Sequence, residues 1–149
     1  ELKVYSKNNK SFESDFKTVT VKDRPVSVVI TSIILSSFPD LNWNGGLWDI
    51  QGLPDIRFQI VDGTNTYMDG AEIAQDADFN LSYTYYGDFP ITLPYNSNYF
   101  INILDEDGTT DELISILNFN PALYSLDEES SVTIIDGDCT LILKLQWVY

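Results

Sequence analysis

The sequence lacks histidine altogether and contains a single cysteine among its 149 residues. Without histidine, the chain excludes serine- or cysteine-histidine relays for nucleophilic catalysis, and it excludes metal sites that need an imidazole ligand. One thiol also excludes a disulfide framework and any site built from several thiolates. Cys139 lies in an alternating apolar segment, so we predict a small core residue rather than a redox group. Because these absences remove most common catalytic classes, we expect the protein not to be an enzyme.

Basic side chains are also scarce, with 8 Lys+Arg against 23 Asp+Glu and a formal net charge of −15. Residues 25–149 contain only Arg57 and Lys144 against 19 acidic side chains, a formal charge of −17. This balance excludes nucleic acid as a partner, because phosphates must be neutralised by Lys and Arg. It also predicts weak or no binding to anionic membranes without calcium, since only a bound cation would offset the repulsion.

Long hydrophobic runs are absent as well. The longest apolar stretch, residues 26–35, is too short to span a bilayer and predicts no transmembrane segment. The sequence has no initiator Met and is rich in Asn, Asp, Ser, Thr and Tyr, which favours a soluble domain of an exported or cell-surface protein. We expect residues 1–25 to form an N-terminal tether or an edge-strand extension, and an arbitrary start of the sequence is the open alternative. Residues 26–149 have the length of one domain.

The periodicity of the chain predicts an all-β fold. Seven or eight short strands separated by turn residues indicate an antiparallel β-sandwich. The predicted strands are residues 26–36, 56–61, 79–86, 89–93, 99–104, 132–135 and 139–148, and the alternating residues 16–21 are predicted as a leading strand or edge extension. Residues 136–138 (DGD) are typical of a hairpin turn between the last two strands. Residues 111–118 are predicted to form at most one or two helical turns.

Two acidic segments follow predicted strands. Asp49 and Asp55 stand six residues apart in the first segment, and Asp105, Asp107 and Asp111 lie in the second. Calcium binds six to eight oxygens drawn from carboxylates, backbone carbonyls and water. Five Asp residues on two neighbouring loops would supply such a set. The alternative is that these residues only form turns and solvate the surface, because Asp and Gly are common in turns.

The joint arrangement resembles the C2-domain family of calcium-dependent lipid-binding β-sandwiches. Residues 48–58 (WDIQGLPDIRF) and 100–114 (FINILDEDGTTDELI) carry the resemblance, and residues 137–145 resemble the last strand of that family. The likeness covers about residues 26–149 and implies an eight-stranded Greek-key sandwich. It implies Ca²⁺ as cofactor, with Asp49, Asp55, Asp105, Asp107 and Asp111 as carboxylate ligands and the backbone carbonyls of Trp48 and Glu106 completing the shell. The segment between Asp107 and Asp111 is two residues shorter than is common, and no lysine-rich strand is present.

Two function classes follow from these features of the sequence. The first is a calcium-binding recognition module whose acidic loops bridge Ca²⁺ to a lipid headgroup, a glycan or a protein surface. The second is a metal-independent structural or adhesive β-sandwich of an exported protein. Trp43 and Trp48 flank the first acidic loop, where a tryptophan would enter a membrane interface or stack on a sugar. We favour the interpretation in which one or both instead cap the core.

Overall fold

Nine β-strands and one short 3-10 helix form the part of the chain that the computed structural model describes, residues 23–48, 52–108, 110–125 and 127–149. The strands are β1 (Ser27–Ser37), β2 (Ile56–Val61), β3 (Thr66–Ala74), β4 (Tyr83–Tyr85), β5 (Ile91–Pro94), β6 (Tyr99–Asp105), β7 (Glu112–Phe119), β8 (Ser131–Asp136) and β9 (Cys139–Val148), and the 3-10 helix is η1 (Pro121–Leu123). The prediction of an all-β fold is therefore confirmed.

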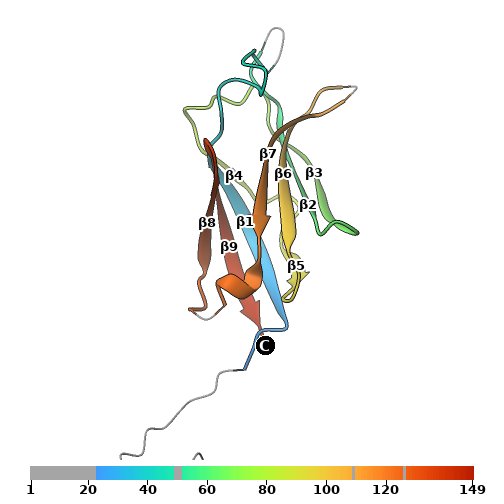
Figure 1. Cartoon of the computed structure of the whole chain (residues 1–149), viewed down its shortest axis with the longest axis vertical. Helices are drawn as coiled ribbons and strands as arrows, with labels where there is room; N and C mark the ends of the chain where they lie inside the picture. The colour runs from blue at the N-terminus through green and yellow to red at the C-terminus, as the bar shows by residue number, and fades with distance from the viewer. Residues whose placement is uncertain (1–22, 49–51, 109, 126) are drawn as a thin grey trace, which may run out of the picture.

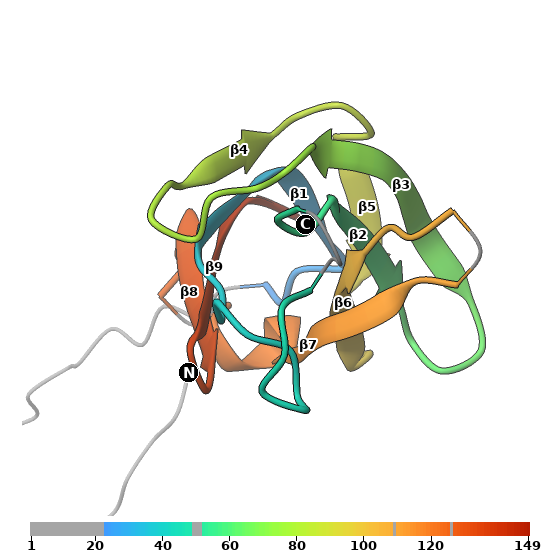
Figure 2. The same cartoon turned by 90° about the horizontal axis from the view of Figure 1, so that it is seen from above.

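The strands form two antiparallel sheets that face each other (Figures 1 and 2). One sheet has the order β4-β1-β9-β8, with β5 also paired to β1, and the other has the order β3-β2-β6-β7. Strands β4 and β5 pair with opposite halves of the same edge of β1. Neighbours such as β1 and β9, or β2 and β6, are distant in sequence, because the chain crosses repeatedly between the sheets. The result is a β-sandwich.

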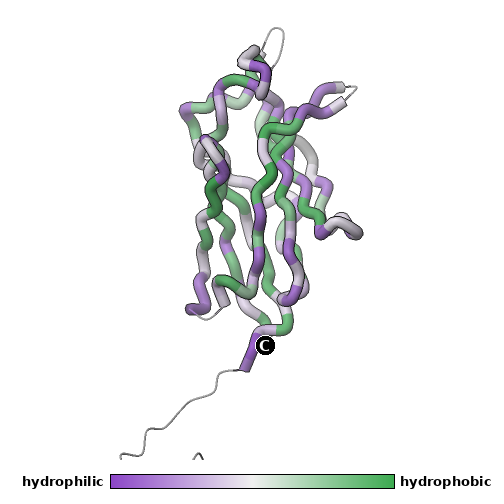
Figure 3. The backbone as a smooth tube through the Cα atoms, in the orientation of Figure 1, coloured by the Kyte–Doolittle hydropathy of each residue, from purple (hydrophilic) through white to green (hydrophobic). Residues whose placement is uncertain are grey.

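The core lies between the sheets and is built by alternating side chains. In β9, Cys139, Leu141, Leu143 and Leu145 are buried while the intervening residues are more exposed, as the period of a strand requires. The side chains of β2 and β6 alternate in burial in the same way, and Figure 3 shows hydrophobic and hydrophilic residues interspersed along the strands. Cys139 is buried, and desolvation raises the pKa of its thiol to about 11. Its predicted place in the core is thus confirmed.

Two segments differ from the sequence-based expectation. Strand β3 was not predicted, and the helical turns expected over 111–118 are instead the edge strand β7. In β7 the register moves from Ile103 opposite Ser115 to Leu104 opposite Leu113, which leaves Ile114 as an extra residue. Such a bulge breaks the two-residue period and places apolar residues at a spacing that imitates a helix. The predicted N-terminal edge strand, residues 16–21, lies outside the described residues.

None of the helical structure in the described ranges has the length and hydrophobicity needed to cross a membrane.

Candidate functional site

Three connections and one hairpin turn gather at one end of the sandwich, which we call the loop end. Their described residues are 38–48 and 52–55 between β1 and β2, 75–82 between β3 and β4, 106–108 and 110–111 between β6 and β7, and the β8–β9 turn at 137–138. The register brings them together, because Ile56 pairs with both Ala74 and Asp105, and Ser37 pairs with Thr140. Both termini of the sandwich lie at the other end (Figure 1).

Asp55 links three of these connections. Its backbone N–H donates to Oδ1 of Asp105 at 2.7 Å, and its backbone carbonyl accepts from the N–H of Glu106 at 2.8 Å. Its own Oδ1 accepts the N–H of Asp76 at 2.7 Å, where Asp76 adopts a positive φ of 47°. The two acidic segments predicted from the sequence therefore meet in space at Asp55 and Asp105. Asp76 was missed because β3, which positions it, was not recognised in the sequence.

Asp105 is the last residue of β6 and has no exposed surface. Burial of a carboxylate is costly unless hydrogen bonds compensate for lost hydration. Part of that compensation is the bond from the Asp55 N–H. Asp105 therefore has a structural function at the foot of the loop, whatever else it binds. Asp107 is partly exposed two residues further on, and Glu106 between them is exposed.

Asp111 is engaged by a basic residue of the strand β2. Its Oδ2 accepts hydrogen bonds from Nε of Arg57, at 3.0 Å, and from Nη2 of the same guanidinium. Arg57 also pairs with Asp69 through Nη1 at 2.5 Å, and the bond to Asp111 raises the pKa of Arg57 above its ordinary value. The side chains of Arg57 and Asp111 are 16% and 26% exposed, so the pair is partly shielded from water. A calcium ion at Asp111 would have to compete with this guanidinium.

The two tryptophans of the first loop have opposite environments. Trp48 is buried, and its Nε1 donates to the backbone carbonyl of Pro39 at 2.9 Å, so it caps the core at the loop end. Trp43 is 82% exposed. The expectation that at least one of them covers the core is confirmed for Trp48, while Trp43 projects outward.

Within the described residues, no group of three or more Asp, Glu, Cys or His side chains has the arrangement needed to hold a metal ion. Asp49, the first predicted ligand, lies outside the described residues. Of the remaining predicted ligands, Asp55 and Asp105 are in contact, Glu106 and Asp107 follow on the same loop, and Asp111 is bound to Arg57. The described part of the chain thus contains a fragment of an oxygen-ligand set, and this fragment is compatible with a cation but does not complete a site.

Comparisons with known proteins bear on the fold. Sequence comparison with protein-family profiles and with curated proteins found no match. The structure is similar to a solved C2 domain, with a TM-score of 0.51 and 10% sequence identity over 83% of this chain and 99% of the other. It also aligns with a structure of the two C2 domains of extended synaptotagmin 2, with a TM-score of 0.47 and 14% identity, over 93% of this chain and 47% of that chain. The chain therefore has the fold of a C2 domain.

Proposed function

We propose that this C2-like domain is a recognition module whose loop end binds Ca²⁺ and bridges it to a partner. The observation that carries the proposal is the contact between Asp55 and Asp105, which joins the two acidic segments at one end of the sandwich. Clustered carboxylates and backbone carbonyls are the oxygen ligands that Ca²⁺ prefers. The C2 fold supports the proposal, because the sequence motifs that resemble that family fall on these same connections.

In this proposal the ligands have unequal functions. The carboxylate of Asp107 is partly exposed on its loop, and Asp55 has a second oxygen besides the one that accepts the Asp76 N–H. Asp105 provides one oxygen while it also supports the loop. Asp49 and the backbone carbonyls of Trp48 and Glu106 would complete the shell. Asp111 would contribute charge nearby rather than coordination, because Arg57 already binds it.

A calcium titration by calorimetry, on the full chain after chelator treatment, tests the proposal. We expect Asp107→Asn to weaken calcium binding by at least tenfold without changing stability in chelator. Asp111→Asn should retain binding within about threefold, since this change removes a partner of Arg57 rather than a calcium ligand. Asp138→Asn is the matched control, because Asp138 is an exposed acid in the β8–β9 turn at the same end.

Thermal melting gives an independent measurement of the same event. A ligand at a hundredfold excess over its Kd stabilises the native state by about 2.7 kcal/mol. For a domain of this size the melting midpoint should rise by about 5–10 °C in calcium relative to chelator. If wild type gives no calorimetric signal and melts identically in both conditions, the calcium proposal is wrong.

A second candidate is a metal-independent recognition or adhesive sandwich. It is favoured by the hydrogen bonds that already occupy Oδ1 of Asp55 and Oδ1 of Asp105, both donated by backbone N–H groups. In that case the acids fix the loops and the partner contacts the loop end directly. The calcium titration separates the two candidates, because only the first predicts a loss specific to Asp107→Asn.

The negative charge of the domain restricts which partners it can bind, whether or not binding requires calcium. With 19 acidic side chains in residues 25–149, a bound Ca²⁺ neutralises only a small part of the charge. We therefore propose a neutral or zwitterionic partner, namely a zwitterionic lipid headgroup, a glycan or a protein surface. We also propose that the domain belongs to an exported or cell-surface protein and acts by binding rather than by catalysis.

A further inference from the structure

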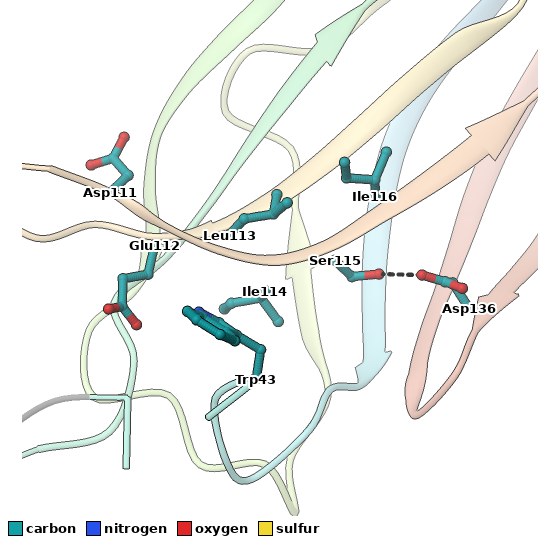
Figure 4. A pocket seen from close by; sticks show the side chains of 8 residues that line it. All are labelled: Trp43, Asp111, Glu112, Leu113, Ile114, Ser115, Ile116 and Asp136. Atoms are coloured by element: carbon teal, nitrogen blue, oxygen red, sulfur yellow. Dashed lines mark hydrogen bonds between the residues drawn. The ribbon is translucent and has the colours of Figure 1, made fainter. Parts of the chain in front are cut away.

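A groove of about 660 Å³ runs beside β7 at the loop end (Figure 4). Its lining combines an aromatic ring, apolar side chains and carboxylates: Trp43, Asp111, Glu112, Leu113, Ile114, Ser115, Ile116 and Asp136. Among the described residues, no basic side chain lines it. In the close view, the Trp43 indole, Ile114 and the carboxylate of Glu112 lie on the same side of β7. Neither Asp55 nor Asp105 lines this groove, so it is distinct from the proposed calcium site.

Trp43 is exposed but held by a defined turn. Oδ1 of Asn42 accepts the N–H groups of Asn44 and Gly46, at 3.1 and 3.0 Å, and Nδ2 of Asn42 donates to the carbonyl of Leu47 at 3.1 Å. Gly45 adopts the positive φ of 75° that the turn requires. These bonds close residues 42–47 around Asn42 and present the indole to the groove. The turn fixes the backbone that carries Trp43, and the 82% exposed indole has a free π-face.

The carboxylates of the groove differ in the partners they have. Asp111 is bound to Arg57, and Oδ2 of Asp136 accepts the hydroxyl of Ser115 at 3.1 Å. Oε2 of Glu112 is shielded from solvent and has no hydrogen-bond partner among the described residues. A shielded, unpartnered carboxylate oxygen is costly. Because the Glu112 residue is itself partly exposed, a donor from outside the domain would relieve this cost once the carboxylate rotates toward the groove. Because this carboxylate lies beside an indole, the donor that fits both groups is a cation, which gains attraction from the ring face and from the carboxylate.

We propose that this groove binds a lysine or arginine side chain presented by a basic segment of a partner protein. The aliphatic part of that side chain would lie along Ile114 and the indole of Trp43, and its cationic head would reach the carboxylate of Glu112. A polypeptide fits better than a free amine, because small ligands are mostly enclosed by their sites, whereas the exposed Trp43 leaves this groove open. The surrounding negative charge would steer a basic segment toward the groove.

The test is an NMR titration of the ¹⁵N-labelled full chain with a blocked tetralysine peptide, in chelator and at physiological salt, where diffuse attraction is screened. The chain has three tryptophans, so Trp43→Phe assigns the indole N–H resonance of Trp43. We expect that resonance and the Glu112 amide to shift together on one binding curve. The same peptide with acetylated lysines should bind at least tenfold more weakly.

Variants separate a defined site from general charge attraction. Glu112→Gln and Trp43→Ala should each weaken tetralysine binding by about fivefold or more, and Trp43→Phe should retain part of it. Glu129→Gln is the matched control, because it removes an equal charge from an exposed position beside the end of β9, away from the loop end. The proposal is overturned if Glu129→Gln weakens binding as much as Glu112→Gln, if the acetylated peptide binds equally, or if the Trp43 indole does not shift. Since all samples contain chelator, none of these outcomes depends on calcium binding.

Discussion

The backbone N–H of Asp55 donates to the carboxylate of Asp105 across 50 positions of sequence, at 2.7 Å. This bond joins the end of the first acidic loop to the end of β6, and Ile56 pairs with Asp105 in the adjoining ladder. The ordering of two separate connections thus depends on one buried side chain.

Asp105→Ala should destabilise the domain by about 2 kcal/mol, because it leaves the Asp55 N–H without its acceptor at a partly buried position. Asp105→Asn should cost less, since the amide oxygen still accepts the bond. Urea unfolding followed by circular dichroism measures both. Asp138→Ala, at an exposed position, should stay within about 0.5 kcal/mol of wild type. Equal stability of Asp105→Ala and wild type would contradict the structural function given to Asp105.

Arg57 should be the most important basic residue for stability. It pairs with Asp69 and Asp111 while only 16% of its side chain is exposed. Arg57→Gln should lower the free energy of unfolding by about 1–3 kcal/mol, because two carboxylates lose their common partner. A double-mutant cycle with Asp111→Asn should show a coupling above about 0.5 kcal/mol. Lys144→Gln serves as the control, since Lys144 is exposed and donates to the hydroxyl of Ser131 at the surface. Additive effects of Arg57→Gln and Asp111→Asn would contradict the pairing.

The β2–β3 turn predicts a loss of stability at alkaline pH. The Tyr67 hydroxyl donates to Oδ2 of Asp62 at 2.8 Å, and this bond raises the pKa of Tyr67 to about 12. The raised pKa favours the protonated phenol in the native state, so its contribution is complete below the ordinary pKa near 10 and disappears as the pH rises from 10 to 12. Urea midpoints measured across that range should fall for wild type. In Tyr67→Phe the fall should be shallower, and an unchanged slope would count against this assignment.

Cys139 should be unreactive until the domain unfolds. It is buried, and desolvation raises the pKa of its thiol to about 11, so little thiolate is present at about pH 8. Iodoacetamide at that pH should label the native chain at least a hundredfold more slowly than the chain in urea, as measured by intact mass. Since this is the only thiol of the sequence, the signal has one source. Rapid labelling under native conditions would show that the β8–β9 hairpin opens locally.

Membrane binding should depend on both calcium and lipid charge. In chelator, vesicles rich in anionic lipid should leave the protein in the supernatant at physiological salt, because the domain and the surface repel each other. With calcium, we expect stronger co-sedimentation with zwitterionic than with anionic vesicles. Tight binding to anionic vesicles in chelator would show that the charge argument is wrong.

The strands that were predicted correctly share a plain alternation. β2 and β9 begin and end where the sequence indicates, because their inward residues are apolar at every second position. The sequence did not predict β3, because it is an edge strand with Gly70 in its middle and with register shifts against β2. A bulge inserts an extra residue and so interrupts the two-residue alternation by which a strand is recognised in a sequence. The bulge in β7 likewise explains why the sequence of that strand resembles a helix.

The candidate site could be located from the sequence, but its internal contacts could not. Two Asp-containing loops after strands indicate one end of a sandwich, and Asp55 and Asp105 do meet there. The capture of Asp111 by Arg57 depends on strand order, since β2 and β7 both flank β6. The exposure of Trp43 and the burial of Trp48 depend on a turn closed by Asn42. Spacing along the chain does not specify such long-range or side-chain geometry.

The placement of the first and last strands also determines how the domain responds to mechanical load. β1 and β9 are antiparallel neighbours, with Ser27 opposite Val148 and the N–H of Val26 bonded to the carbonyl of Val148 at 2.7 Å. A force that separates Val26 from Val148 therefore acts along the hydrogen bonds of this ladder, which run perpendicular to the strands. Such a force breaks the bonds one after another, as a zipper opens, instead of shearing them together. The pairs of that ladder nearest the loop end, at the far side of the sandwich, would be the last to be loaded.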